Sequence, residues 1–285
     1  MPIPTARLLI TCPDRQGIIA IVARFIAEHG GNIVEADQHS DPQHGEFFMR
    51  VEIDPEGFRL DRSSFARAWE PTARECKMRW WMYWGNDVKR MAILVSKESH
   101  CLSDLLGRWQ TGELRVEIPF VAGNHESLRQ RAISHGLAFH HLPAAPKTKA
   151  RQEARLTALL EEADVDFIVL ARYMQILSPE FVAAYPQRTI NIHHSFLPAF
   201  AGPRPYRQAF ERGVKLIGAT SHYVTDELDA GPIIAQSTLP VGHRDSLEDL
   251  IRKGRDLERM VLATAVRHHV EDKILVSRNK TVVFD

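Results

Sequence analysis

Hydrophobic and polar positions in the first part of the chain predict the element order β-α-β-β-α-β. Strands are favoured by the apolar or alternating runs over residues 6–12, 32–40, 46–53 and 79–84. Two helices are predicted between them, one from Gly17 to about Glu28 and one from about Asp61 to Cys76 that Pro71 disturbs. This order is typical of a ferredoxin-like fold, in which a four-stranded sheet carries both helices on one face. The other face of the sheet is then free to pair.

A second pattern begins at about residue 88, where short apolar strands alternate with helices. Strands are predicted over 90–95, 115–121, 167–171, 189–192, 215–224 and 232–237. Helices are predicted over 103–111, 126–135, 149–163 and 205–212, with a last amphipathic helix after the cap-like residues 245–248. This alternation predicts an α/β domain with a doubly wound, mostly parallel, Rossmann-like sheet, whose active site lies at the carboxyl ends of the strands. The turn-forming residues 85–87 divide the chain into domains 1–85 and 86–285.

The amino-acid composition limits the kinds of partner that the protein is expected to bind. Lys and Arg number 36, and Asp and Glu also number 36, so no net charge attracts the protein to nucleic acid or to anionic lipid. Three cysteines without C-x-x-C spacing indicate reduced thiols. The first residues lack the pattern of a signal peptide and no apolar stretch is long enough for a membrane span, so we expect a cytoplasmic protein that binds neither nucleic acid nor membrane.

The first strand-to-helix turn of the second domain argues against a nucleotide. In a doubly wound sheet this turn must be rich in glycine to bring backbone N–H groups against a phosphate. Residues 96–101 contain no glycine and add the carboxylate of Glu98. NAD, FAD and ATP are therefore disfavoured, as is a phosphorylated substrate.

Asn191, His193 and Asp229 are the strongest candidates for chemistry. Asn191 and His193 are two residues apart at the end of a predicted strand, so their side chains share one face. Asp229 lies on a later loop bounded by Gly231 and Pro232. An amide donor, an imidazole and a carboxylate together suit acyl transfer, which needs an oxyanion donor, a proton shuttle and a group that orients the shuttle or a water. Each residue alone is more often structural.

A metal site and a nucleophilic cysteine are only weakly indicated by the sequence. The paired histidines at 140/141, 193/194 and 268/269 have no third ligand at a metal-binding spacing, so we expect no metal site. Cys101 lies near the predicted cleft, but an inert buried cysteine is the commoner case.

The first domain resembles the ACT family of regulatory domains. The resemblance rests on the stretch Asp14-Arg15-Gln16-Gly17-Ile18 and on His29-Gly30-Gly31-Asn32-Ile33. It implies a regulatory amino-acid site formed by Asp14, Arg15, Gly17, Gly30, Asn32 and Ile33, for which methionine or glycine, as end products of one-carbon metabolism, are candidate effectors. It also implies a homo-oligomer, a dimer or a tetramer, because ACT domains usually pair through their open sheet. An ordinary tight turn and helix end is the alternative interpretation of these residues.

The second domain resembles the folate-dependent formyltransferases and, among them, the formyltetrahydrofolate deformylases. Residues 191–200, from Asn191 to Phe200, and residues 228–234, from Leu228 to Ile234, carry this resemblance. It implies that water attacks 10-formyltetrahydrofolate to give tetrahydrofolate and formate for purine and one-carbon metabolism. Asn191, His193 and Asp229 would be catalytic, the folate would be the substrate, and no prosthetic group would be needed.

The same resemblance implies a set of substrate-binding residues: Arg172, Tyr173, Met174, Gln175, Ile176, Leu177, His194, Gly202, His222, Val224 and Thr225. His222 could equally be a loop histidine without a role in binding. Two other functions stay open, a formyltransferase to an unknown small acceptor and a catalytically silent ACT-type sensor of an amino acid or folate. The intact set of three catalytic candidates argues against the sensor.

Overall fold

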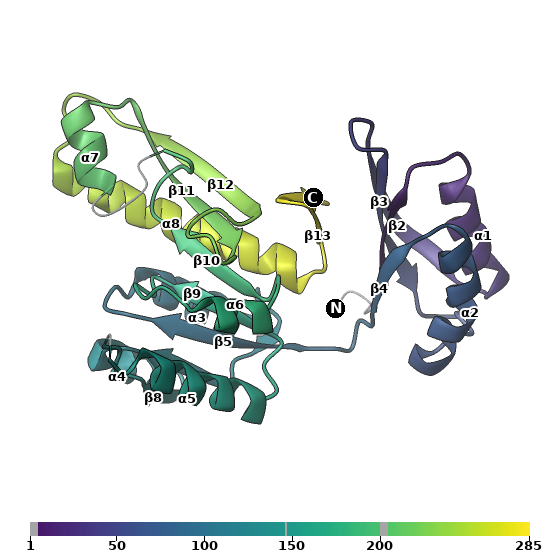
Figure 1. The fold of residues 1–285 in the computed structure, drawn as a ribbon, viewed down its shortest axis with the longest axis horizontal. Coiled ribbons are helices and arrows are strands. Elements are labelled where there is room, and N and C mark those ends of the chain that lie inside the picture. The colour runs from purple at the N-terminus through teal and green to yellow at the C-terminus, as the bar shows by residue number, and fades with distance from the viewer. Residues whose placement is uncertain (1–4, 146, 200–204) are drawn as a thin grey trace. The chain divides into compact units, whose positions relative to one another are not determined.

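The chain folds as two compact units (Figure 1). The structure, a computed structural model, describes residues 5–145, 147–199 and 205–285. The first unit comprises the residues up to Asp87 together with 271–277 and 281–285, and the second comprises 88–270 with 278–280. The last residues of the chain therefore belong mostly with the first unit, whereas the sequence placed them in the second domain.

The first unit has the expected ferredoxin-like order. Its elements are β1 (Ala6–Pro13), α1 (Ile18–Glu28), β2 (Asn32–Asp41), β3 (Glu46–Asp54), α2 (Arg62–Glu75) and β4 (Arg79–Tyr83). The strands form an antiparallel sheet in the order β2-β3-β1-β4. Pro71 lies inside α2 without ending it, and Asp61 caps the start of α2 by accepting hydrogen bonds from Ser63 and Ser64.

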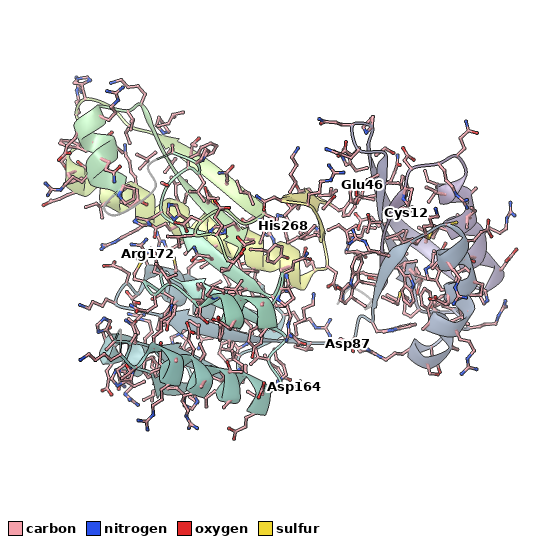
Figure 2. All side chains as sticks on the ribbon, viewed as in Figure 1. Cys12, Glu46, Asp87, Asp164, Arg172 and His268 are labelled. Carbon is pink, nitrogen blue, oxygen red and sulfur yellow. The ribbon has the colours of Figure 1, made fainter. Side chains whose placement is uncertain are left out.

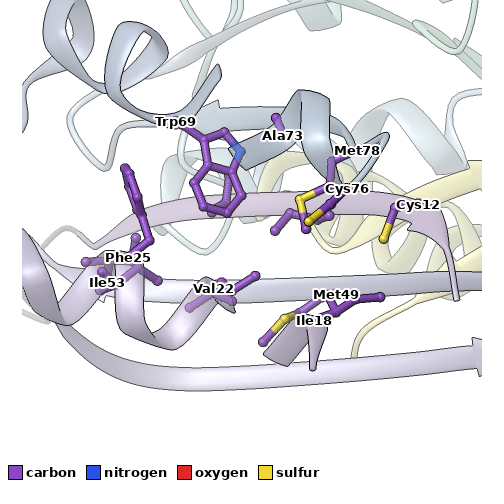
Figure 3. Packing of buried hydrophobic residues seen from close by; sticks show 14 of the residues in the cluster. Cys12, Ile18, Val22, Phe25, Met49, Ile53, Trp69, Ala73, Cys76 and Met78 are labelled. Carbon is purple, nitrogen blue, oxygen red and sulfur yellow. The ribbon is translucent and has the colours of Figure 1, made fainter. Parts of the chain in front are cut away.

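The core of the first unit lies between the sheet and its two helices. Alternate residues of β1, among them Ile10 and Cys12, share this core with Phe25 of α1 and Trp69 of α2. Figure 3 shows Cys12, Phe25 and Trp69 within the cluster. The rings of Phe25 and Trp69 meet edge to face with centroids 4.7 Å apart. Cys12 is buried, as is Cys76, and both are free thiols, as expected from the sequence.

The opposite face of the same sheet is partly covered by the end of the chain. Here β13 (Ile274–Ser277) and β14 (Lys280–Val283) form a two-stranded sheet that the sequence analysis did not predict. Leu275 and Phe284 pack against Leu9 and Phe48 on this face. Less of the sheet is therefore free for pairing between subunits than we expected.

A buried arginine fixes the chain end on this face. The side chain of Arg50 is 1% exposed, and its guanidinium donates to the carbonyl oxygens of Asp272 (3.0 Å) and Glu271 (3.2 Å). Arg7 pairs with the Asp272 carboxylate at 3.2 Å. The Arg50 guanidinium also pairs with Glu35 of β2 and Glu52 of β3, so Arg50 ties residues 271 and 272 to the sheet.

The second unit has a sheet of eight strands flanked by helices. Its elements are β5 (Lys89–Val95), α3 (His100–Gln110), β6 (Val116–Glu117), β7 (Phe120–Gly123), η1 (Glu126–Leu128), α4 (Arg129–Ile133), β8 (Ala138–His141), α5 (Lys149–Glu162), β9 (Phe167–Ala171), α6 (Pro179–Ala184), β10 (Thr189–His193), α7 (Pro205–Arg212), β11 (Leu216–Tyr223), β12 (Ile233–Pro240) and α8 (Leu247–Val270). Seven strands follow the order β12-β11-β10-β9-β5-β7-β8, and β6 pairs with β5. The neighbouring strands from β10 to β8 in this order pair in parallel. Strand β11 pairs antiparallel with both β10 and β12.

Three predictions within this unit were imprecise. The strand predicted over 115–121 is broken into β6 and β7 around Pro119, because proline cannot donate to a strand ladder. The helix predicted over 126–135 is reduced to a short 3₁₀ turn and α4. The short elements β8 and α6 were not predicted.

The strand order places a ligand site between β5 and β9. The chain winds outward from β5 to β8 and then returns to β9 on the other side, so the order reverses between β5 and β9. A crevice forms at such a reversal, outside the carboxyl ends of the strands. The long helix α8 packs against β10, β11 and β12 and against α3 and α7. Among the described residues, none of the helices is both long and apolar enough to span a membrane.

Candidate active site

A cavity of about 830 Å³ lies at the carboxyl ends of β9 and β10 in the second unit. Asn191, His193 and Asp229 line it together, as do all the predicted substrate-binding residues that the structure describes. Gly202, the remaining predicted residue, lies outside the described residues. Residues from β9, β10, α8 and the loop between β11 and β12 therefore converge on one space.

His193 and Asp229 form an ion-pair geometry at the cavity wall. The Nδ1 atom of His193 lies 3.2 Å from Oδ2 of Asp229, and the His193 ring is 5% exposed. The Nε2 atom of His193 is buried and has no hydrogen-bond partner among the described residues. A carboxylate at Nδ1 holds the proton there, so Nε2 of the neutral ring is left to act as a base.

The loop that carries Asp229 is shaped by a glycine. Asp229 has φ 55°, in the left-handed region that aspartate tolerates better than most residues. A Cβ atom on Gly231 would lie 1.8 Å from the carbonyl oxygen of Tyr223, so only glycine lets the chain return to β12 at this point. The backbone N–H of Tyr223 donates to the carbonyl of Pro232 at 2.9 Å and closes the loop.

Asp229 stays ionised in this environment. Burial alone would raise its pKa, but the His193 ring at 3.2 Å and the His222 ring at 3.7 Å together hold the pKa of the Asp229 carboxyl well below its ordinary value. The negative charge of Asp229 beside Nδ1 stabilises the imidazolium that forms when Nε2 of His193 takes up a proton.

Asn191 is oriented by His222. Its Nδ2 atom lies 3.2 Å from Nε2 of His222, and the two residues face each other in the β10–β11 register. Nδ1 of His222 donates to the carbonyl of Tyr223 at 2.9 Å, which leaves Nε2 of the neutral ring to accept from the amide. An amide nitrogen carries two hydrogens, so the second N–H of Asn191 is available to the cavity.

The loop after His193 is pinned to β11. Thr220, which pairs with His193 in the strand register, donates to the carbonyl of Ser195 at 2.9 Å and accepts from the backbone N–H of Leu197 at 3.0 Å. Gln236 of β12 donates to the same hydroxyl at 2.9 Å. These bonds hold the start of the loop beyond the candidate base in one conformation.

His194 packs behind His193. The two rings have centroids 5.2 Å apart, and the ring of Tyr206 lies 6.0 Å beyond His194. Burial lowers the pKa of His194 to about 4, and the nearby charge of Arg172 acts in the same direction. His194 is therefore neutral near pH 7 and adds no positive charge beside His193.

The segment from Arg172 to Leu177 forms a mainly apolar wall of the cavity. Met174 is 57% and Ile176 64% exposed although both are large apolar side chains, and both line the cavity. Tyr173 is buried and its hydroxyl accepts from Gln152 at 2.7 Å. The hydroxyl of Ser96 accepts from the backbone N–H of Met174 at 2.9 Å and so ties this wall to the end of β5. Exposed apolar side chains on a fixed backbone suit a flat aromatic ligand.

A buried cluster around Glu258 was not predicted. Glu258 of α8 is 1% exposed and lines the cavity together with Arg172, Tyr206 and His100. The sequence carried one signal for it, because the apolar stripe of α8 that includes Leu257 and Val261 contains this single buried carboxylate. Hydrogen bonds from His100 and Tyr206 and the charge of Arg172 outweigh burial and lower the pKa of Glu258.

The same neighbourhood contains three side chains of the types that bind metal. Within the residues that the structure describes, ligand atoms of His100, Cys101 and Glu258 lie within 4.8 Å of one another. Burial raises the pKa of the Cys101 thiol well above its ordinary value, and the guanidinium of Arg172 already neutralises the carboxylate. This arrangement favours an internal ion cluster over a bound cation, and it makes Cys101 a poor nucleophile.

The residues expected to form a regulatory site do not converge within one chain. Asp14, Arg15 and Gly17 follow β1 at the end of the sheet where Pro13 pairs with Glu46. Gly30, Asn32 and Ile33 lie at the opposite end, where Asn32 pairs with Asp54. A Cβ atom on Gly30 would lie 2.5 Å from the carbonyl oxygen of Gly57, so this glycine has a packing role.

Comparison with known families agrees with the two units. Residues 89–266 match the family model described as formyl transferase, and residues 6–61 match the ACT domain. The chain is 52% identical over 280 residues to a formyltetrahydrofolate deformylase of Bacillus subtilis, which covers 98% of this chain and 93% of that protein.

Comparison with solved structures agrees with these family matches. A crystal structure of a formyltetrahydrofolate deformylase from Pseudomonas syringae superposes with a TM-score of 0.96 at 51% identity, covering 99% of this chain and 94% of that one. A glycinamide ribonucleotide transformylase from Symbiobacterium toebii superposes with a TM-score of 0.66 at 31% identity, covering 71% of this chain and 97% of that one.

Proposed function

This chain belongs to the formyltetrahydrofolate deformylase family, and we propose that it hydrolyses 10-formyltetrahydrofolate to tetrahydrofolate and formate through Asn191, His193 and Asp229. The observation that carries the assignment of residues is the 3.2 Å contact between His193 and Asp229, which leaves Nε2 of His193 unpartnered in the cavity. The reaction would supply formate to one-carbon and purine metabolism.

In the first step, water attacks the formyl carbon. Nε2 of His193 accepts a proton from the water as its oxygen bonds to carbon, and the negative charge of Asp229 stabilises the imidazolium that forms. The formyl oxygen becomes an oxyanion, which accepts a hydrogen bond from the available N–H of Asn191. His222 contributes by holding the Asn191 amide in place.

In the second step, the tetrahedral intermediate collapses. The bond between the formyl carbon and N10 breaks while the protonated ring of His193 gives its proton to N10. Tetrahydrofolate and formic acid result, and formic acid loses its proton to solvent at neutral pH. The folate is the substrate and no prosthetic group is required, because side chains handle each charge and each proton.

The folate occupies the apolar half of the cavity. Its flat pterin ring fits the wall of Met174, Ile176 and Leu177, with Val224 and Thr225 on the facing loop. Gln175, whose amide donates to the carbonyl of Met174 at 2.8 Å, stabilises the backbone of this wall. This orientation brings N10 and its formyl group toward Asn191 and His193.

The test is to incubate the purified protein with 10-formyltetrahydrofolate alone and to measure formate and tetrahydrofolate. We expect equal amounts of both products without any acceptor, and Asn191→Ala should lower kcat about 10²- to 10³-fold because one oxyanion donor is lost. Folate binding without formate release would contradict the proposal and favour a transferase with a missing acceptor or a sensor.

We also propose that the first unit binds a small amino acid, methionine or glycine, in a homo-oligomer. The unpaired N–H groups at the start of α1, next to Gly17 with φ 88°, suit a carboxylate. Either amino acid should then change the deformylase rate or raise the melting temperature, and light scattering should report a mass above one chain. A monomer that responds to neither would contradict this part.

A further inference from the structure

Arg172 has an unusual backbone conformation at the centre of the catalytic unit. It follows directly on the last residue of β9 and has φ 62°, in the left-handed region where glycine is the ordinary residue. A strained non-glycine residue beside a reaction cavity indicates that its side chain has a role there. The comparison residue Asp164 also has a positive φ of 47°, but it is exposed at the edge of the unit (Figure 2).

The side chain of Arg172 is directed at a fully buried carboxylate. Its Nε atom lies 3.3 Å from Oε2 of Glu258, and the two side chains are 13% and 1% exposed. Glu258 also accepts from the hydroxyl of Tyr206 at 2.5 Å and contacts Nε2 of His100 at 2.8 Å. We call these four residues, Arg172, Glu258, Tyr206 and His100, the polar plug.

The polar plug is built into three elements. Glu258 comes from α8, Tyr206 from α7 and His100 from the start of α3. Gly254, one turn before Glu258, makes room for the plug, because a Cβ atom there would lie 2.1 Å from Cζ of Tyr206. Beside the plug, Glu98 pairs with Arg255 at 2.8 Å, so the side chains of the loop after β5 are tied to α8 as well.

The polar plug lines the same cavity as the apolar side chains of Met174, Ile176 and Leu177, on which the folate is proposed to pack. All four of its residues line the same cavity as the catalytic set, and His194 lies between Tyr206 and His193 in the row of rings. If the pterin packs on the apolar wall, a second substrate would reach the formyl carbon along the part of the cavity that the plug lines. Water is small enough to enter without displacing it.

We infer that Arg172 is a specificity-determining residue that restricts the reaction to water, because its side chain, paired with Glu258, narrows the space an amine acceptor would need. The inference rests on the proposed hydrolysis. The related Symbiobacterium toebii enzyme is named a transformylase, so the shared catalytic fold does not itself require water as acceptor. A local difference must decide between the two outcomes, and Arg172 supplies bulk where backbone geometry favours glycine.

Once the plug is removed, an amine can take the place of water as the acceptor of the formyl group. The amine nitrogen of the acceptor bonds to the formyl carbon and gives one proton to Nε2 of His193. The bond from carbon to N10 then breaks, and N10 takes that proton. The products are tetrahydrofolate and a formylated amine, and no formate is made in this branch.

The experiment compares Arg172→Gly with the double variant Arg172→Gly/Glu258→Gln, which leaves no unpaired buried charge and so stays folded. Each is given 10-formyltetrahydrofolate with glycinamide or with glycinamide ribonucleotide, and formate and formylated amine are both measured. We expect at least one of the two variants to raise the ratio of formylated amine to formate at least about tenfold over the wild type. Hydrolysis is expected to fall but to stay measurable.

Two controls separate bulk from charge and from backbone strain. Arg172→Met keeps the bulk without the charge and should form no more formylated amine than the wild type. Asp164→Gly relieves the same kind of backbone strain far from the cavity and should behave as the wild type in both products. The inference is overturned if neither plug variant forms more formylated amine than the wild type, or if Arg172→Met forms as much as Arg172→Gly. A wild type that releases no formate would instead refute the proposed function.

Discussion

At the scale of single residues, the site depends on how charge is arranged around one imidazole. Asp229 is negative on one side of His193, and neutral His194 packs on another side of the ring. A second cation in direct contact would oppose protonation of His193 during the reaction. The neutrality of His194 is therefore part of the proposed chemistry, and it has a consequence for stability.

His194 should make the protein less stable in mild acid. Its pKa falls from 6.5 to about 4 on folding, so between these values the unfolded chain binds a proton that the folded chain does not. Keeping His194 neutral costs no stability above about pH 6.5. The free energy of unfolding then decreases as the pH falls from 6.5 toward 4. Since one pKa unit is about 1.4 kcal/mol, the loss in the free energy of unfolding reaches at most about 3.5 kcal/mol.

Urea unfolding from pH 4 to pH 7 checks this expectation. His194→Asn should show a shallower fall in the free energy of unfolding than the wild type over this range. His243→Asn, which changes a histidine at the exposed surface, is the matched control. Parallel curves for the wild type and His194→Asn would show that His194 is not held neutral.

At the scale of elements, α8 connects the cavity to the rest of the second unit. Its buried residues include Leu250, Leu257 and Val261, as the periodicity of the sequence predicted, and Glu258 among them. The sequence predicted its start at the cap-like residues 245–248, and the pair that exchanges hydrogen bonds there, at 3.0 and 3.1 Å, is Ser246 and Asp249. The close fit between Gly254 and Tyr206 was not foreseen.

Substitutions of two helical glycines should have opposite effects. Gly254→Ala would force Tyr206 out of place and should destabilise the protein by about 1–3 kcal/mol, the usual effect of overpacking. Gly107→Ala in α3 meets nothing within 4 Å and should stabilise the protein by about 0.5–1 kcal/mol through helix propensity. Urea titration measures both, and equal effects would refute the role of Gly254 in seating Tyr206.

Local patterns predicted most of the elements and the catalytic candidates, and contacts distant in sequence account for what was missed. Asn191 and His193 share a strand face by spacing alone, so their convergence was predictable. Asp229 was a candidate from its place on the loop bounded by Gly231 and Pro232, and the family resemblance was needed to favour a catalytic role over a structural one. The residues that bind Glu258 lie about 50 to 160 positions away in the sequence, and their local patterns do not predict that they contact it.

At the scale of the whole molecule, the chain end belongs structurally to the first unit. The covalent path leads from α8, which carries Glu258, directly into residues 271–277, which pack on the sheet of the first unit. No sequence pattern indicated this packing, because β13 and β14 are short and their apolar residues resemble an ordinary terminal segment. The packing identifies the chain end as part of the first unit's core.

Phe284→Ala should therefore destabilise the protein strongly for a residue next to the end of the chain. Phe284 is 5% exposed against Leu9 and Phe48, and removing a buried phenylalanine costs about 3–5 kcal/mol. Phe210→Ala, which removes a ring that is 45% exposed on α7, should change stability by no more than about 0.5 kcal/mol. A Phe284→Ala variant as stable as Phe210→Ala in thermal unfolding would show that the chain end is not held on the sheet.

The central claim is that Asp229 and His193 act together on a water. The most direct measurement is the single-turnover rate of formate release by Asp229→Asn, with the dissociation constant of the folate measured in parallel. Asparagine keeps the shape and tolerates the positive φ of this position, so only the charge is removed. We expect the rate to fall about 10²- to 10⁴-fold with folate affinity nearly unchanged. A variant that releases formate at the wild-type rate would contradict the account.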